Sequence, residues 1–307
     1  MNVYQRLQLA LATEGISGLV RRTARKFTGS ERALVTNAKD EYQQLLDSFS
    51  ERTMSKGYGD MSQYYWYHTI DLGDGLVTPG DYDYRSSLPL FRFPEDMKGK
   101  TVLDVGSATG FFAFEFEKRG ADVTSVELPS VADWDMPLGA DREQTLKELM
   151  AYHRVHTVEE VQRFHLDGPF EFCRKALKSN VRRCHSTVYD LSPDKLGRGA
   201  FDIIFLGDIL LHTFSPFKAL SVLAPLCRDT LIIAQAISNV VDVPIMVYCG
   251  GDSRNDDNRT WFHPNRLCLE QMLTRLGFRT VKLVGRHTGI ARRHWSVYDR
   301  SIIHAKR

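Results

Sequence analysis

The 307-residue sequence lacks the features that mark several common protein classes. Its five cysteines never form a C-x-x-C pair, so they indicate reduced thiols in a cytoplasmic protein and no metal site. No apolar run approaches the roughly 20 residues of a membrane-spanning helix, and a signal-peptide pattern is absent. The formal net charge of +2 is too small to indicate a nucleic-acid partner by itself.

One short motif is the most informative part of the chain. A β-branched strand, Thr101–Val105, is followed by a loop with glycines at positions 106 and 110 and then by an amphipathic helix, Phe111–Arg119. Such a unit places backbone N–H groups at one point and predicts a nucleotide-type cofactor site. Ala108 stands where a dinucleotide fingerprint has its second glycine, which favours a cofactor without phosphate at the loop. The expected cofactor-binding residues here are Asp104, Gly106, Ser107, Ala108 and Gly110.

Strand and helix patterns alternate through the rest of the chain, which predicts an α/β fold with a mostly parallel sheet. We expect a Rossmann-like sheet of seven strands with helices on both faces. The expected strands are Thr101–Val105, Asp122–Glu127, Ser186–Tyr189, Phe201–Leu206, Thr230–Ala236, Thr280–Val284 and Ser301–Ala305. This core domain covers residues 98–307 and contains a helical insertion, residues 128–182, of the kind that recognises substrates.

The first 97 residues form an N-terminal extension in this interpretation. Residues 1–50 have helical periodicity and a basic cluster of Arg21, Arg22, Arg25 and Lys26, which is either a solvated helix face or a contact for an anionic partner. Residues 56–93 are rich in tyrosine, glycine and aspartate, which is typical of an aromatic lid or a packed cap. Tyr67 and His68 of this segment are candidates for substrate contact.

Two acidic residues follow predicted strands where an adenosine would lie. Glu127 ends the second strand and can accept hydrogen bonds from both ribose hydroxyls, with Leu128 beside it. Asp190 follows the third predicted strand and can meet the adenine amino group, with Leu191 beside it. The alternative roles are a surface or helix-capping carboxylate for Glu127 and an N-cap for Asp190.

The fourth predicted strand leads to the candidate catalytic residues. It runs through Gly207 to Asp208, and His212 follows within one turn. A neutral imidazole at position 212 could take a proton from an acceptor hydroxyl, or it could simply bond to the backbone. Asp208 is the other candidate base, or a helix cap. Further along, the candidates for the acceptor pocket are Tyr248, His263 and the polar run 252–259, ahead of a helix expected over Pro264–Leu276.

Taken together, these segments resemble a class I S-adenosylmethionine-dependent methyltransferase. The resemblance covers roughly residues 98–307 and implies S-adenosyl-L-methionine as the cofactor, with Tyr82 and Arg85 near it on the N-terminal side. A narrower similarity is to the tRNA wobble-uridine carboxymethyltransferase-like group. The segments that carry it are Leu206–His212 with Ser215-Pro216, Arg259–Pro264, and Leu276–Phe278.

The chain departs from that narrower group in the contacts to a carboxylated cofactor. The resemblance implies a lysine before the first strand and a tyrosine just before His212, but the region of Tyr67 has no lysine and position 211 is leucine. Arg300 could match a third, C-terminal basic contact. Since an unpartnered buried carboxylate is costly, we predict transfer of a plain methyl group.

The expected function is therefore methyl transfer to a hydroxyl of a small molecule, such as a natural product, or of a glycan. The first alternative is tRNA wobble-uridine modification, which predicts a basic groove of Arg182, Arg183, Arg292 and Arg293. The second is a catalytically inactive, cofactor-binding scaffold. The sequence favours a small-molecule or glycan partner over nucleic acid, and it is compatible with a homo-oligomer.

Overall fold

A computed structural model describes residues 29–237, 242–250 and 259–307. Its main sheet has seven strands in the order β3-β2-β1-β4-β5-β9-β8. The first five run parallel, and β9 pairs antiparallel with both of its neighbours, β5 and β8. The expected Rossmann-like fold class is thus confirmed. The strands are β1 (Thr101–Val105), β2 (Asp122–Glu127), β3 (Arg182–His185), β4 (Phe201–Gly207), β5 (Cys227–Gln235), β8 (Thr280–Ala291) and β9 (Ser296–Lys306).

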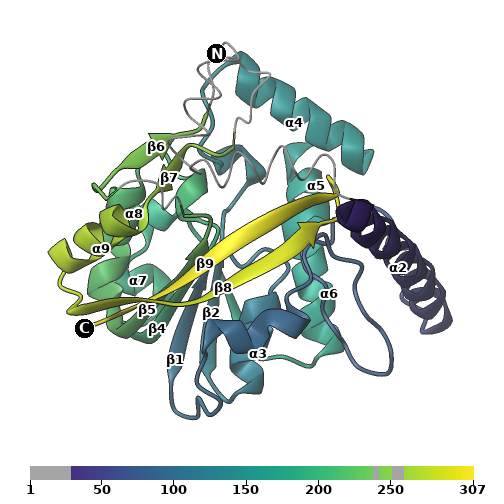
Figure 1. Cartoon of the computed structure of the whole chain (residues 1–307). Coiled ribbons are helices and arrows are strands. Elements are labelled where there is room, and N and C mark those ends of the chain that lie inside the picture. The colour runs from purple at the N-terminus through teal and green to yellow at the C-terminus, as the bar shows by residue number, and fades with distance from the viewer. Residues whose placement is uncertain (1–28, 238–241, 251–258) are drawn as a thin grey trace.

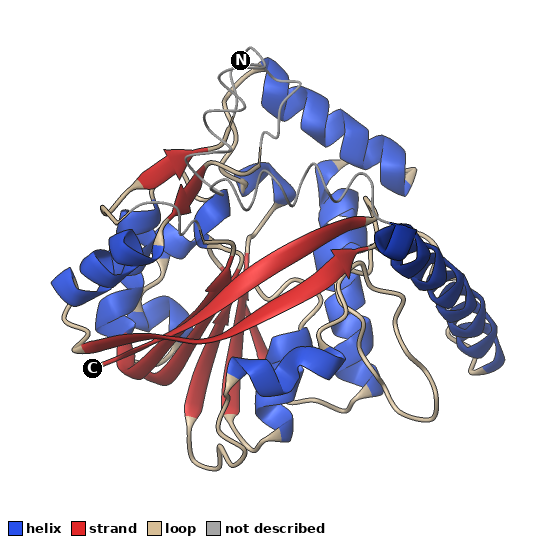
Figure 2. Cartoon of the chain, in the orientation of Figure 1, coloured by secondary structure: helices blue, strands red, loops and turns tan. Residues whose placement is uncertain are grey.

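Helices cover both faces of this sheet (Figure 1). On one face lie α3 (Phe111–Lys118) and α6 (Gly168–Ala176), whose phenylalanines pack with aromatic residues of the N-terminal segment. On the other lie α7 (Pro193–Leu196), α8 (Pro216–Leu223) and α9 (Arg266–Arg275) around a core rich in leucine and isoleucine. Figure 2 shows the resulting layers of helix, sheet and helix. The two cores bury both faces of the central strands.

The third strand lies four residues earlier than the sequence predicts. Ser186–Tyr189 reads as a β-branched run, but the strand is Arg182–His185 and a 3₁₀ turn follows at Val188–Asp190. β3 is the edge of the sheet and pairs only with β2, so its side chains are partly exposed and polar. An edge strand does not need the continuous apolar run by which the central strands are identified.

The C-terminal part of the fold also differs from the expectation. β8 and β9 form a hairpin that is much longer than the two predicted strands, and it crosses the front of the sheet in Figure 1. A separate two-stranded sheet, β6 (Met246–Tyr248) and β7 (Phe262–Pro264), was not predicted. Pro264 therefore ends a strand, and Asn265 caps α9 by accepting a hydrogen bond from Cys268 N.

The segments outside the core are α2 (Gly29–Ser55), the irregular aromatic stretch before β1, and the insertion with α4 (Ala140–His153) and α5 (Val158–Gln162). The basic cluster at residues 21–26 lies outside the described residues. No helix in the described ranges has the length and apolarity to cross a membrane.

The aromatic core between α3 and the sheet yields a stability prediction. Phe205 is 1% exposed, and its ring contacts those of Phe112, Phe116 and Phe93 at centroid distances of 4.4, 5.6 and 5.7 Å. Phe205→Ala should lower the free energy of unfolding by about 3–5 kcal/mol in urea titrations, because it leaves a cavity the aromatic neighbours cannot fill. Phe217→Ala, at a side chain 43% exposed, should cost well under half as much. Equal losses would contradict this packing.

Candidate functional site

A cavity of about 580 Å³ lies where the parallel strands end. Such an edge of an open α/β sheet is where ligands bind, and the volume is ordinary for a small-molecule site. The loop after β1, the ends of β2 and β4, the aromatic segment and the insertion all contribute to the wall. Among the predicted site residues, the lining contains Tyr67, His68, Tyr82, Asp104, Gly106, Ser107, Ala108, Glu127, Leu128, Gly207, Asp208, His212 and His263.

The loop after β1 turns sharply around the cavity floor. Gly106, Ala108 and Gly110 all have left-handed backbone angles, with φ of +70°, +46° and +91°. A Cβ atom on Gly106 would lie 1.9 Å from Cδ1 of Ile209, so this position has no room for a side chain. Ala108 thus adopts a left-handed conformation that is uncommon for residues other than glycine. Such backbone conformations are found preferentially at functional sites.

The backbone amides of this loop are already hydrogen-bonded within the protein. Gly106 N and Ser107 N donate to Val126 O at 2.9 and 3.2 Å, and Gly110 N donates to Ser107 O at 2.8 Å. Ala108 N donates to Glu127 Oε2 at 2.8 Å. A phosphate-binding loop needs amides that point at the ligand. These four amides do not, which agrees with the cofactor class that Ala108 suggested.

Glu127 is buried at the end of β2, and backbone N–H groups fix its carboxylate. Oε2 accepts from Ala108 N and Oε1 accepts from Leu128 N at 3.0 Å. The side chain lines the cavity while its residue is only 6% exposed. A carboxylate oxygen can accept more than one hydrogen bond, so Glu127 can still receive hydrogen bonds from a ligand's hydroxyls.

Arg183 supports this carboxylate from below the loop. Its Nη1 donates to Ser107 Oγ, to the Ala108 carbonyl and to Ser125 Oγ at 2.7, 3.2 and 3.0 Å. Its Nη2 lies 3.9 Å from Glu127 Oε2, and the guanidinium stacks over the Phe170 ring at 4.2 Å. The buried cation therefore balances the buried anion. Sequence reasoning placed Arg183 in an open groove because the strand that carries it was not recognised.

Asp104, in β1, is the most deeply buried carboxyl of the site. It is 1% exposed, and its Oδ2 has no hydrogen-bond partner among the described residues. Burial, with a further contribution from the negative charge of Glu127, raises the pKa of Asp104 to about 7, against the lowering effect of Arg183. A neutral carboxyl group can thus be present on the cavity floor near physiological pH.

Asp208 and Arg300 form an ion pair at the end of β4. Asp208 has a left-handed backbone angle, φ +54°, and its Oδ2 accepts from Arg300 Nε at 2.6 Å. The carboxylate is 7% exposed, and the pair raises the pKa of Arg300 further above its usual range although burial opposes this. Because the Asp208 carboxylate is already engaged by Arg300, His212 is the better candidate for a base.

His212 is exposed to the cavity and fixed in one orientation. Its Nδ1 bonds to the carbonyl oxygen of Arg259, which can only accept. Nδ1 therefore carries a hydrogen, and the lone pair of the neutral ring is on Nε2. This tautomer is the one that a histidine acting as a general base through Nε2 uses.

The aromatic segment forms the opposite wall. The rings of Tyr67 and Tyr82 lie 4.8 Å apart, and Tyr84 stacks beyond Tyr82 at 6.2 Å. His68 bonds through Nδ1 to Thr109 Oγ1 at 3.1 Å, and burial lowers its pKa to about 3. This neutral ring joins the aromatic segment to the loop after β1.

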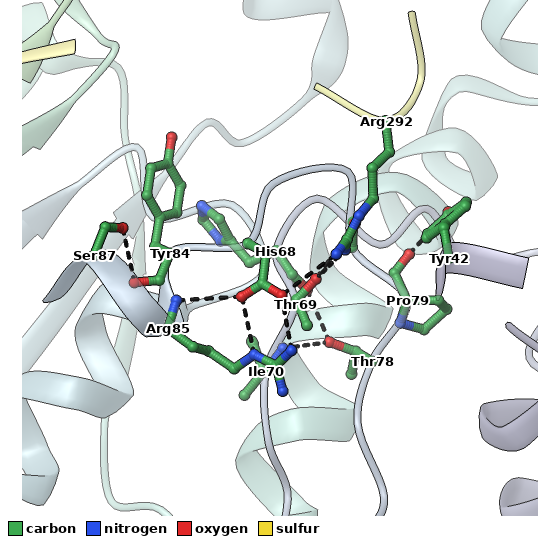
Figure 3. A network of polar contacts seen from close by, with 12 residues as sticks. Tyr42, His68, Thr69, Ile70, Thr78, Pro79, Tyr84, Arg85, Ser87 and Arg292 are labelled. Atoms are coloured by element: carbon green, nitrogen blue, oxygen red, sulfur yellow. Dashed lines mark hydrogen bonds and ion pairs between the residues drawn. The ribbon is translucent and has the colours of Figure 1, made fainter. Parts of the chain in front are cut away.

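Arg292, from the end of the long hairpin, fixes the same segment from the other side. Figure 3 shows its guanidinium reaching Thr69, and Nη1 donates to Thr69 Oγ1 and to the Gly80 carbonyl at 2.8 Å each. Tyr42 of α2 donates to the Pro79 carbonyl at 3.1 Å in the same view. The cavity wall is therefore built from chain segments more than 200 residues apart.

Five predicted residues do not line the cavity. Asp190 is exposed and accepts from Thr187 Oγ1, while Leu191 is buried in the core on the far side of the sheet. Arg85 pairs with Asp83 at 2.7 Å, and Tyr248 is 52% exposed on β6. Gly110 contributes only to the backbone turn.

Ser186–Tyr189 lie where Asp190 was expected, because β3 ends four residues before the predicted strand. Residues 252–258 of the predicted polar run lie outside the described residues, whereas Arg259 lines the cavity.

Several lining residues were not predicted at all. Trp134 and His165 come from the insertion, Tyr65 and Asp81 from the aromatic segment, and His294 from the hairpin turn. Arg293 of the same turn also lines the cavity, and it was predicted only as part of a basic groove for RNA. The unusual length of the insertion was the available sequence signal, but nothing in it singled out individual residues. No group of three or more metal-ligating side chains occurs within the described ranges.

Comparison with known proteins gives similarity at the level of the fold. No protein-family model and no curated protein matches the chain. One similar structure is magnesium protoporphyrin IX methyltransferase from Synechocystis PCC 6803 with bound SAH, 16% identical over 69% of this chain and 75% of that chain, with a TM-score of 0.41. Another is 1,6-didemethyltoxoflavin-N1-methyltransferase from Burkholderia thailandensis, 15% identical over 68% and 72%, with a TM-score of 0.42. A third is an O-methyltransferase family protein from the same organism, 14% identical over 73% and 56%, with a TM-score of 0.43.

The raised pKa of Asp104 predicts how stability depends on pH. The folded chain binds a proton at Asp104 up to about pH 7, whereas the unfolded chain releases it near pH 4, so stability falls between these values as pH rises. Asp104→Asn removes this loss. The stability of the variant relative to wild type should therefore increase by roughly 2 kcal/mol from pH 5 to pH 8 in urea titrations. The exposed Asp194→Asn serves as the control, and a parallel pH profile for Asp104→Asn and wild type would refute the prediction.

Proposed function

We propose that this protein is an S-adenosylmethionine-dependent methyltransferase that methylates a hydroxyl group of a small molecule or glycan. The observation that carries the proposal is the buried Glu127 carboxylate, fixed by Ala108 N and Leu128 N on the wall of the cavity. Two backbone donors hold the carboxylate in place, and its remaining lone pairs can accept from a pair of ribose hydroxyls.

The residues present fit the rest of this cofactor. The loop after β1 offers a tight turn whose amides are bonded internally, which suits an uncharged nucleoside better than a pyrophosphate. Leu128 and Ser186–Tyr189 line the adjoining wall, where an adenine ring would lie against apolar and backbone atoms. Oδ2 of Asp104, without a partner among the described residues, adds a polar group on the floor. Tyr82 supplies an aromatic wall on the N-terminal side, while Arg85 is paired with Asp83 outside the cavity.

Bound in this cavity, S-adenosylmethionine would supply a methyl group activated by its sulfonium. The chain's task is then to orient the acceptor and to remove its proton, since no protein nucleophile is required. His212 is oriented for this task because its Nδ1 bonds to the Arg259 carbonyl and its Nε2 has the lone pair. Asp208, paired with Arg300, supplies a fixed negative charge at the end of β4.

The same ion pair supports an unmodified methyl donor. A carboxylated cofactor needs cationic or hydroxyl partners for its carboxylate, and Arg300 was the remaining basic candidate. Arg300 Nε already donates to Asp208 Oδ2 at 2.6 Å, so an internal carboxylate is present at this position. A second carboxylate there would be repelled by Asp208.

The character of the cavity wall supports a small acceptor over RNA. Tyr65, Tyr67 and Trp134 form aromatic surfaces, with the carboxylates of Asp81 and Asp133 beside them. Of the four arginines considered for an RNA groove, Arg182, Arg183 and Arg292 donate hydrogen bonds to Thr124, Ser107 and Thr69 within the protein. The fourth, Arg293, lies over the rings of Tyr65 and Tyr152. RNA binding relies on accessible cations that meet phosphates. A pocket for a sugar or an aromatic ring fits these walls better.

Cofactor binding can be tested by isothermal titration with S-adenosylhomocysteine. Wild type should bind it, and Glu127→Ala should weaken binding by at least about tenfold, because hydrogen bonds to a charged group contribute roughly 1.5–3 kcal/mol. Asp202→Asn is the matched control. Asp202 lies at the opposite end of the sheet, where its carboxylate accepts from Thr101. Undiminished affinity of Glu127→Ala would rule out the assigned role of this carboxylate.

Transfer can be tested with tritiated S-adenosylmethionine and a panel of phenols, sugars and polyketide alcohols. His212→Ala should lower kcat by about 10²–10⁴-fold with little change in cofactor affinity, the usual effect of losing a general base. His304→Ala is the control, since His304 bonds to the Phe91 carbonyl away from the cavity. An unchanged kcat in His212→Ala would exclude it as the base, and cofactor binding without transfer to any acceptor would favour a scaffold.

A further inference from the structure

His165 is a further histidine on the cavity wall, and the proposed function gives it no role. His165 belongs to the insertion and lies in a π-helical turn, Arg163–Asp167, between α5 and α6. π-helical turns inside helices occur frequently at functional sites. The side chain is 5% exposed and lines the cavity, so it combines burial with contact to the ligand space.

A chain of hydrogen bonds fixes the tautomer of His165. Nδ1 of His153 lies 2.9 Å from the carbonyl oxygen of Gln63, which can only accept, so this nitrogen carries a hydrogen. In a neutral His153 ring the lone pair is then on Nε2, which lies 3.0 Å from Nδ1 of His165. His165 Nδ1 must therefore donate, and the lone pair of His165 is on Nε2.

Both rings remain neutral at physiological pH, which this chain of bonds requires. Burial lowers the pKa of His153, and the nearby positive charge of Arg293 adds to the effect. For His165, burial lowers the pKa well below its usual value, assisted by His153, Arg293 and Arg259. A protonated His165 would have two donors and no acceptor.

Nε2 of His165 is the atom left for a ligand. Among the described residues this nitrogen has no hydrogen-bond partner. It is not among the fully buried polar atoms without a partner, so it is accessible from the cavity that His165 lines. Tyr65 stacks on the same ring at 4.4 Å with an interplanar angle of 14°, and Trp134 meets it edge-on at 5.8 Å. The imidazole cannot rotate without breaking the Tyr65 stack and the bond to His153.

The chemistry around this nitrogen specifies what it can bind. The Tyr65 hydroxyl donates to Asp81 Oδ2 at 2.6 Å, which places a carboxylate beside the histidine. A lone-pair nitrogen and a carboxylate both accept hydrogen bonds, and the guanidinium of Arg293, 5.4 Å from the centre of the Tyr65 ring, adds a donor on the same wall. Trp134 adds a partly exposed aromatic surface from the insertion. A neutral molecule with hydroxyl groups on a ring matches this combination of hydrogen-bond acceptors and aromatic surface.

We propose that His165 Nε2 accepts a hydrogen bond from a ring hydroxyl of the methyl acceptor, and that His153 fixes the tautomer that allows it. The inference rests on the proposed function only in calling the ligand a methyl acceptor. His165 is thus a substrate-binding residue, His153 is a positioning residue, and the acceptor class is a neutral hydroxylated ring compound such as a sugar or a phenol.

Nitrogen NMR of the full chain tests the tautomer and the binding together. With ¹⁵N-labelled histidines and saturating S-adenosylhomocysteine, the Nε2 signal of His165, assigned through its loss in His165→Gln, should be that of an unprotonated nitrogen from pH 6 to pH 8. Titration with methyl β-glucopyranoside or with phenol should shift this signal saturably with one of the two probes, which distinguishes a sugar from a phenol acceptor. His304, whose Nε2 donates to the Phe91 carbonyl, is an internal control that should not move.

Variants separate binding from a structural role. His165→Phe should weaken binding of the active probe by at least about fivefold, whereas His165→Gln, which retains an acceptor atom, should weaken it less. His153→Phe should remove the tautomer preference of His165 and reduce the probe-induced shift. All three variants should still bind S-adenosylhomocysteine as wild type does, which shows that they fold.

Two results would overturn the proposal: a hydrogen on His165 Nε2, or no shift with either probe in a chain that binds S-adenosylhomocysteine. Failure of that cofactor analogue to bind would count against the proposed function instead. The probe titration would still be read in the cofactor-free chain, so the two failures remain distinct.

Discussion

The hydrogen bond from Ala108 N to Glu127 Oε2 is the contact on which the rest of the site depends. It joins the loop after β1 to the end of β2. In a phosphate-binding loop such a backbone N–H would donate to the ligand, whereas here it donates to a carboxylate of the protein. Burying this carboxylate requires compensation, and Arg183 provides it from beneath the loop, with its guanidinium stacked on Phe170. The loop after β1, the Glu127 carboxylate and the Arg183 guanidinium therefore form one unit, and a substitution in any of the three removes contacts of the other two.

The central part of this unit could be predicted from the sequence because central strands are buried on both faces. β1 and β4 are mostly apolar, each with one aspartate, and residues that follow them line the cavity. The edge strand β3 gave no such signal, since Arg182 and Arg183 are polar and the apolar-looking run comes after it. Because β3 lies four residues earlier than predicted, Asp190 does not reach the cavity, and Arg183, which lies within the strand, was not recognised as a residue of the site. The error in one strand end thus explains two errors in the predicted site.

The half of the cavity that we assign to the methyl acceptor was much harder to predict, for a physical reason. Its residues belong to the aromatic segment, the insertion and the hairpin turn, and none of these is defined by a strand of the sheet. The chemical state of His165 depends on His153 and on the carbonyl of Gln63, a residue about 100 positions earlier in the chain. No local pattern reports such a relationship. Sequence reasoning identified His212 because it follows a strand end, and it missed His165 because no strand marks it.

The two halves of the cavity consequently rest on different parts of the structure. The half that we propose for the cofactor is built into strands whose side chains also form the core, so Asp104 and Glu127 cannot change without affecting packing or buried charge. The acceptor half is held by side-chain contacts between segments, such as Arg292 with Thr69 and Tyr65 with His165. Substitutions at Trp134 or Arg293 can alter the shape of that wall while β1, β2 and β4 stay as they are. The wall that we assign to the acceptor can therefore be changed by substitution with less effect on the core than the part that we assign to the cofactor.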